Sequence, residues 1–334
     1  RVPAFPRLWG GDMFIKKDTR KASEILTEDQ DLTEVKFARR PQEFKGSLGT
    51  LRKHRHAAAL RQVTVASFYA NSLLSLTGIE AFVPHGALLE LSLGCNKLTD
   101  LPKEFGDLSS LQKLWLDDNQ LSVFPPALLQ LSKLKVLRLS SNRIPSLPAT
   151  IRLLGELEEL AIDNNCLADI PDTIAELTGL RILNLRQNQL EALPEDIGRC
   201  SALTHLTVSS NRLGALPESC GQLEALEVLL ANGNRLEAFP NQLLPLASEH
   251  GRLVRLNLSH NSLSLPLPDE LAGSFILSAG SGTHGGAEIL LHGNPGLVVP
   301  PAPQAGGPHG KKRSADSARL STTVAEPAEG DLTA

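Results

Sequence analysis

Aliphatic residues recur along the chain at fixed distances from a repeated asparagine. Between Asn96 and Asn234, seven asparagines follow one another at intervals of 23 residues. Each has aliphatic residues eight, five and three positions before it, Leu or Ile two positions after it, and proline six positions after it. The chain therefore contains a repeat of pattern LxxLxLxxNxLxxLPxxhxxLxx, where h is apolar, and a repeat of this period predicts a solenoid.

Less regular copies extend the array at both ends. A degenerate copy precedes the regular set around Asn71, and two copies with longer spacing follow around Asn261 and Asn294. We count about ten units. One unit cannot cover its own apolar side chains, so the units must stack and the two ends of the stack need caps.

The xLxLx segment of each unit predicts a short strand. Alternate side chains of a strand point to opposite faces, so the leucines point inward and their neighbours line the outer side. The following Asn can both donate and accept hydrogen bonds to loop backbone, and Pro favours an irregular connection. We predict an α/β solenoid with a curved, parallel concave sheet and a convex side of irregular, 3₁₀ or short helical segments. The predicted structural ladder consists of Asn96, Asn119, Asn142, Asn165, Asn188, Asn211, Asn234 and Asn261.

This unit resembles the leucine-rich repeat of the 23-residue LP type. The resemblance covers about residues 60–300. The repeat unit is similar to the repeats of plant intracellular Ras-group-related proteins, Ras-pathway scaffolds and Scribble-like polarity proteins. It implies binding of a protein partner through the concave face, in intracellular signalling or complex assembly. A small GTPase, kinase or phosphatase partner is implied by the resemblance alone.

The composition changes at both ends of the repeats. Residues 1–50 hold 18 charged residues and five of the 13 aromatic residues, so we assign residues 1–59 to an N-terminal arm and cap. A helix over 21–37 that covers the first repeat is one interpretation, and an arm that becomes ordered on a partner is the other. The solenoid spans 60–299, with a loop expected at 265–286, and a disordered tail rich in Pro, Gly, Ser and Ala spans 300–334.

The outward columns of the strands carry the candidate binding residues. Trp115 is the only tryptophan in the repeats, and the pattern places Arg138 beside it on the next strand. Trp and Arg are enriched at interface hot spots. The alternative is that the N-terminal arm folds back over Trp115. The candidate protein-binding residues are Lys113, Trp115, Asp117, Val136, Arg138, Glu159, Asp163, Ile182, Asn184, Arg186, His205 and Leu230.

Charge, apolar runs and cysteines limit the location and the partners. The net charge is −4, which gives no basic field for nucleic acid. No apolar stretch approaches the ~20 residues of a membrane span, and no signal peptide is evident. Four cysteines without a CxxC pair argue against zinc and disulfides. We expect a cytoplasmic protein, with an organelle interior as the alternative and secretion excluded. Whether Arg1 is a processed or a truncated start stays open.

Candidate chemistry is sparse. Asp117 and Asp163 are predicted two strands apart with Ser140 between them, but an open, shallow surface does not exclude water. The sequence shows no nucleophile constellation, metal cluster or phosphate cradle, so we predict no enzyme, no cofactor and no metal. The favoured function is a non-catalytic protein-interaction scaffold. A structural subunit of a large assembly, organellar or not, anchored by its N-terminal arm is the alternative, and an enzyme acting through the tail or an unrecognised cleft ranks last.

Overall fold

The computed structural model describes residues 21–22, 26, 33–52, 60–248, 250–264, 267–268, 275–276, 281–284 and 287–297. Within these residues one sheet has the strand order β1-β2-β3-β4-β5-β6-β7-β8-β9-β10-β13-β12-β11. All pairs from β1 to β10, and the pair β10–β13, are parallel, whereas β13–β12 and β12–β11 are antiparallel.

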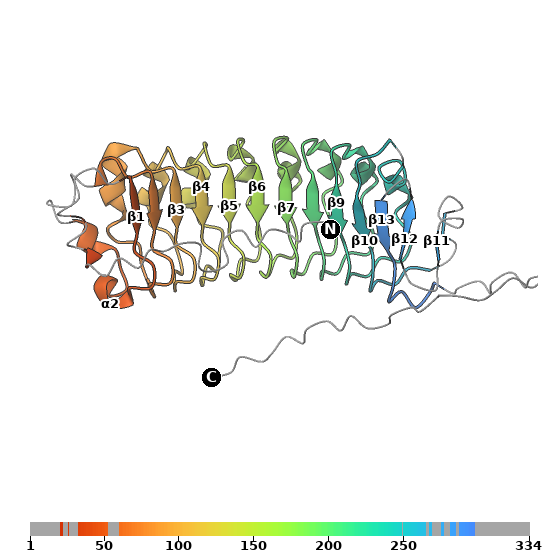
Figure 1. Cartoon of the computed structure of the whole chain (residues 1–334), viewed down its shortest axis with the longest axis horizontal. Coiled ribbons are helices and arrows are strands. Elements are labelled where there is room, and N and C mark those ends of the chain that lie inside the picture. The colour runs from red at the N-terminus through yellow and green to blue at the C-terminus, as the bar shows by residue number, and fades with distance from the viewer. Residues whose placement is uncertain are drawn as a thin grey trace, which may run out of the picture. The chain divides into compact units, whose positions relative to one another are not determined.

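The strands are short, and β1 to β10 lie side by side in chain order, followed by β13, β12 and β11 (Figure 1). Their bounds are β1 Glu34–Lys36, β2 Val65–Ser67, β3 Glu90–Ser92, β4 Lys113–Trp115, β5 Val136–Arg138, β6 Glu159–Ala161, β7 Ile182–Asn184, β8 His205–Thr207, β9 Val228–Leu230, β10 Arg255–Asn257, β11 Phe275–Ile276, β12 Ser281–His284 and β13 Ala287–Leu290. Each repeat thus contributes one strand to a continuous sheet.

The connections on the other side of the repeats are mostly 3₁₀ turns. Apart from the four-residue helix α2, Pro41–Phe44, the described connections contain the 3₁₀ helices Gly49–Arg52, Ile79–His85, Lys103–Asp107, Pro126–Gln130, Ala149–Leu153, Asp172–Glu176, Ile197–Arg199, Glu218–Gln222 and Asn241–Leu243. The repeat proline stands just before most of these turns in extended backbone, as Pro102 does at φ −67°, ψ 155°. Its ring fixes φ and it has no N–H, so the turn starts after it. These turns and the parallel sheet confirm the predicted solenoid.

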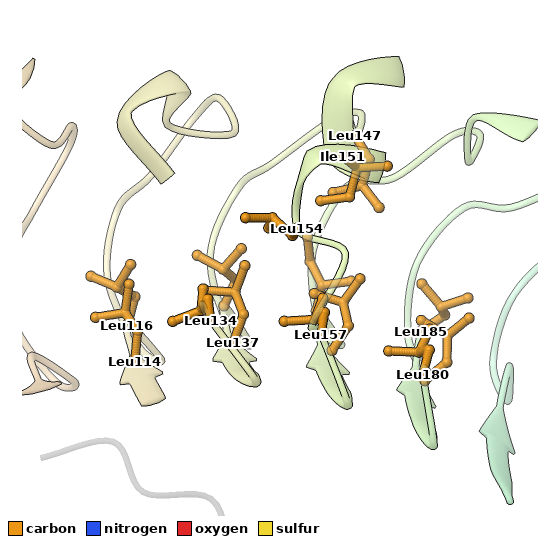
Figure 2. Close-up of a cluster of buried hydrophobic side chains, with 14 of the residues drawn as sticks. Leu114, Leu116, Leu134, Leu137, Leu147, Ile151, Leu154, Leu157, Leu180 and Leu185 are labelled. Carbon is orange, nitrogen blue, oxygen red and sulfur yellow. The ribbon is translucent and has the colours of Figure 1, made fainter. Parts of the chain in front are cut away.

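The repeat leucines form rungs inside the molecule. Leu91 is in register with Leu114, and Leu114 with Leu137. These three side chains are fully buried. Figure 2 shows how leucines from successive repeats stack, with Leu154 and Ile151 of the 3₁₀ side closing the same core. The packing confirms that the periodic aliphatic residues hold adjacent coils together.

The repeat asparagines are buried and bond to two repeats at once. Asn119 Nδ2 donates to the carbonyls of Leu93, 3.0 Å, and Leu116, 3.1 Å, and its Oδ1 accepts from the N–H of Leu98 at 3.0 Å. The same donor and acceptor pattern occurs at Asn96, Asn142, Asn165, Asn188, Asn211, Asn234, Asn261 and Asn294. The side chains supply the partners that buried loop backbone requires.

The N-terminal part of the chain adds a further unit to the sheet. The expected helix over 21–37 is wrong at its end, because Glu34–Lys36 form β1, parallel to β2. Val35 and Phe37 are buried while Glu34 and Lys36 are exposed, which is the period of two of a strand. Phe37 packs against Phe44 and Phe68 with ring centroids 5.8 and 6.0 Å apart. Residues 1–20 lie outside the described residues.

At the C-terminal end the sheet changes direction. The loop expected over 265–286 is wrong in part, since Phe275–Ile276 and Ser281–His284 form strands. Ser281 pairs with Leu290 and Thr283 with Glu288, so the β12–β13 hairpin covers the edge that β13 would otherwise expose. The predicted tail, 300–334, lies outside the described residues.

Candidate protein-interaction face

The flanking residues of the strands form one surface, which we call the outer sheet face. It consists of the first and third residues of β2 to β10, of Glu288 and Leu290 in β13, and of the residue two positions after the last of these in each repeat. In β4 the middle residue, Leu114, is buried, whereas Lys113 and Trp115 are half-buried and point the other way. This alternation repeats in the neighbouring strands and places the predicted binding residues on the face. The core leucines are therefore not available for recognition.

Trp115 and Arg138 are neighbours on this face. They are register partners on β4 and β5. The guanidinium Nε of Arg138 donates to Glu159 Oε1 on β6 at 2.7 Å, and both side chains are partly exposed. On the other side, Lys113 Nζ is 2.8 Å from Glu90 Oε1 on β3. Ion pairs between successive strands thus fix the long side chains around Trp115.

A second group joins the acidic residues of the third column. Ser140 N donates to Asp117 Oδ1 at 3.2 Å, and Ser140 Oγ donates to Asp163 Oδ1 at 2.5 Å. Asn184 Nδ2 also donates to Asp163 Oδ1, at 2.8 Å. Burial raises the pKa of Asp117 to about 6, although the charge of Arg138 and the hydrogen bonds from Ser140 lower it. The structure therefore brings Asp117, Asp163 and Asn184 into one hydrogen-bonded network.

The remaining predicted residues lie towards the C-terminal end of the face. Ile182 is the register partner of His205, whose Nδ1 is 2.9 Å from Thr204 Oγ1. Leu230 is half-buried on β9, and the exposed Arg186 follows β7. These side chains are separated from Trp115 by at least two strands, so they form a second region rather than one cluster with it.

One residue of this second region was not selected from the sequence. Thr207 lies in the column of Trp115 and Arg138, in register with Leu230. Only 3% of this residue is exposed, and its hydroxyl forms no hydrogen bond within the part of the chain that the structure describes. A threonine at this position looks like any polar strand residue in the sequence, so its burial gave no signal there.

The cysteines and histidines do not assemble a metal site in the described ranges, where no group of three His, Cys, Asp or Glu side chains could hold an ion. Cys200 and Cys220 are buried in the core as predicted, and burial raises the pKa of their thiols to about 11 and about 12. Thiols with such pKa values stay protonated and are poor nucleophiles. His260 and His292 stack edge to face at 5.0 Å near the C-terminal end.

Among the described residues, no helix combines the length and the apolar character that crossing a bilayer requires.

Comparison with known families decides the nature of the repeat. The family model described as a leucine-rich repeat region matches residues 86–184, a second leucine-rich repeat model matches 178–236, and a third matches 252–274. The chain is a leucine-rich repeat protein. The matches do not distinguish the LP type from other types of the repeat.

Solved leucine-rich repeat structures resemble the chain. A leucine-rich repeat protein of Leptospira interrogans is 27% identical, with a TM-score of 0.67 over 84% of this chain and 71% of that one. The Arabidopsis thaliana receptor kinase ectodomain GASSHO1/SCHENGEN3, in complex with CASPARIAN STRIP INTEGRITY FACTOR 2, is 30% identical with a TM-score of 0.56. The alignment covers 64% of this chain and 26% of that one, so it spans about a quarter of that ectodomain.

A further plant receptor gives a similar result. The Arabidopsis receptor kinase HAESA ectodomain, in complex with an IDA peptide hormone, is 26% identical with a TM-score of 0.56, covering 64% of this chain and 37% of that one. No curated protein matches the chain.

Proposed function

We propose that this leucine-rich repeat protein is a non-catalytic scaffold whose outer sheet face binds a folded protein partner in intracellular signalling or complex assembly. Leucine-rich repeat domains generally mediate protein–protein interactions. The observation that carries the proposal is the register of Trp115 beside Arg138, with the guanidinium oriented by Glu159. Trp and Arg are both among the residue types enriched at interface hot spots.

The dimensions of the face agree with this proposal. Ten parallel steps of ~4.8 Å give a sheet about 48 Å long, three side chains wide. A stable interface needs about 800 Å² from each partner. Small outward residues, Ala161 and Ser209, alternate with larger ones and give the face relief.

Two solved relatives support a protein or peptide as the ligand. The GASSHO1/SCHENGEN3 and HAESA ectodomains are solved with a protein factor and a peptide hormone bound. For this chain we propose the LP type, on the 23-residue spacing and the proline six positions after each Asn. A cytoplasmic location, and a small GTPase, kinase or phosphatase as partner, follow from the resemblance of that type to intracellular scaffolds.

The test compares two pairs of substitutions in the full chain used as bait. Trp115→Ala with Arg138→Ala changes the outer sheet face, while Arg152→Ala with Leu153→Ala changes exposed residues of the 3₁₀ side. Quantitative affinity purification should recover at least one partner with the wild-type chain and the control, and at least tenfold less with the face variant. Equal recovery of every partner by the two variants would overturn this placement, provided that both melt cooperatively.

The alternative is a structural subunit anchored by its N-terminal arm. In the structure, a shorter part of that arm is free to act as an anchor than the sequence suggested. Residues 34–36 pair with β2, and Phe37 and Phe44 are buried, so this part belongs to the sheet and its core. No contact of the described residues favours the subunit over the scaffold.

A further inference from the structure

The outer sheet face carries an excess of negative charge between β3 and β6. The excess comes from four acids against two bases: Glu90, Asp117, Glu159 and Asp163 against Lys113 and Arg138. Lys113 and Arg138 are each paired with a glutamate. Asp117 and Asp163 form no ion pair with any described residue, so the excess charge lies along these two aspartates.

Apolar and unsatisfied groups continue the same surface. Val136, Ile182 and Leu230 are half-buried outward residues, and Val228 is more than nine-tenths buried. The hydroxyl of Thr207, in the middle of this region, is buried without a hydrogen-bond partner in the described chain. Leaving such a group unpaired costs about 1–3 kcal/mol, so its burial favours a further segment that bonds to it. The face therefore suits an occupant that is both basic and apolar.

The first 20 residues of the same chain have this composition. They hold five basic and two acidic residues, with Phe5, Leu8, Trp9, Phe14 and Ile15 among them. Their net charge of +3 opposes the excess on the face. Trp9 is the only tryptophan besides Trp115.

The point of attachment lies at the correct end of the sheet. Ala22 is buried and its N–H donates to the Glu43 carboxylate of α2 at 2.5 Å, next to β1. Twenty residues reach at most about 66–72 Å. The seven strand steps from β1 to β8 span about 34 Å. The segment is thus long enough to reach Asp117, Asp163 and Thr207.

We propose that residues 1–20 dock in cis on the outer sheet face, over the Asp117–Asp163 network and towards Thr207. The segment then covers the surface that the proposed function gives to the partner, which has to displace it. Tethering provides an effective concentration on the order of 1 mM. A segment with an intrinsic Kd of ~0.1 mM would occupy the face about ten times more often than not, and would weaken partner binding about tenfold.

The test uses the full chain without any partner, so it can fail independently of the proposed function. The photo-crosslinking residue p-benzoyl-phenylalanine is placed at position 9 (Trp9→p-benzoyl-phenylalanine). Crosslinked peptides are then identified by mass spectrometry. Leu320→p-benzoyl-phenylalanine is the matched control in the C-terminal segment. We expect Trp9 crosslinks within residues 113–140 and 205–230, and none there from position 320. A mixture of 15N-labelled and unlabelled chains separates cis contacts from contacts between copies.

Two kinds of result would overturn the proposal. The first is that crosslinks form only between differently labelled chains. The second is that Trp9 gives no crosslinks to the outer sheet face, or gives crosslinks to the 3₁₀ side alone. Charge reversal adds a second readout: Arg7→Glu, Lys16→Glu and Lys17→Glu together should reduce the yield of face crosslinks at least fivefold. The matched reversal of Lys311, Lys312 and Arg313 to Glu should leave the yield unchanged. An equal yield from both variants would remove the electrostatic basis of the proposal.

Discussion

The side-chain nitrogen of Asn142 donates to the carbonyl oxygen of Leu116, one repeat earlier, at 3.0 Å. The same nitrogen donates to the carbonyl of Leu139 in its own repeat, and the side-chain oxygen accepts from the N–H of Leu121. One buried amide thus satisfies backbone groups on two neighbouring coils. Since each coil contacts only its neighbours, such bonds contribute directly to the coupling between repeats.

Replacing this amide should destabilise the whole array. Asn142→Ala leaves the carbonyl of Leu116 and the N–H of Leu121 buried without these bonds, and we expect a loss of about 2–4 kcal/mol in the free energy of unfolding. Urea denaturation followed by circular dichroism measures it. The control is Asn241→Ala, at an exposed position with no described side-chain hydrogen bond, which should change stability by less than about 0.5 kcal/mol.

The stacked leucines allow a matched comparison of one substitution in two environments. Leu137 is fully buried in the middle of the array, whereas the Leu153 side chain is 53% exposed on the 3₁₀ side. Leu137→Ala creates a cavity between two neighbouring rungs and should cost about 2–5 kcal/mol. Leu153→Ala should cost less than about 1 kcal/mol. Similar losses in the two urea titrations would contradict the assignment of the inward rows.

Much of the fold could be predicted because the repeat itself encodes the register. Once Asn96 and Asn119 are aligned, Leu91 must lie beside Leu114, and no other spacing buries both leucines. The N-terminal unit lacks this signal. Arg40 occupies the place of the ladder Asn, donating its backbone N–H to Asn71 Oδ1, and only four alternating residues mark β1.

Two further features could not be predicted from the sequence: the local backbone conformation before each ladder Asn, and the burial of individual side chains on the outer sheet face. The residue before each ladder Asn has a positive φ, 54° at Asp118 and at Gln187, because its N–H must reach the next coil: Asp118 N donates to Ser140 O. The residue types at this position are too varied to reveal it. Similarly, which outward side chain is covered, as Thr207 is, depends on how far its neighbours extend.

Asp117 gives the protein a pH-dependent stability. Burial raises the pKa of its carboxyl from 3.8 in the unfolded chain to about 6 in the folded one. The folded state therefore binds the proton more tightly, and this contribution to stability is complete below pH 3.8 and is lost as the pH rises to about 6. Above pH 6 the folded chain carries a poorly solvated carboxylate.

The neutral isostere Asp117→Asn removes that carboxylate while keeping an acceptor for the Ser140 N–H. At pH 7.5 we expect the variant to be more stable than wild type, because it no longer buries a charged carboxylate. The gain should be about 1–2 kcal/mol, since that carboxylate is only partly shielded from solvent. At pH 4 the two should be nearly equal. Urea titrations at both pH values measure the difference, with the exposed Asp169→Asn as control. A stability gain of the same size at both pH values would show that burial of the charge is not its cause.

The junction between the N-terminal unit and the first repeats depends on one glycine. Gly78 has φ +110°, and a Cβ at this position would lie 2.1 Å from the backbone oxygen of Leu48. Gly78→Ala therefore meets backbone that cannot rotate away, in a conformation that disfavours a side chain. We expect a loss of about 2–4 kcal/mol, felt first as faster hydrogen exchange in residues 33–52. At Gly155, by contrast, an added Cβ meets nothing within 4 Å. Gly155→Ala should leave both the exchange of 33–52 and the urea midpoint unchanged, and equal exchange in the two variants would mean that this contact does not hold the N-terminal unit in place.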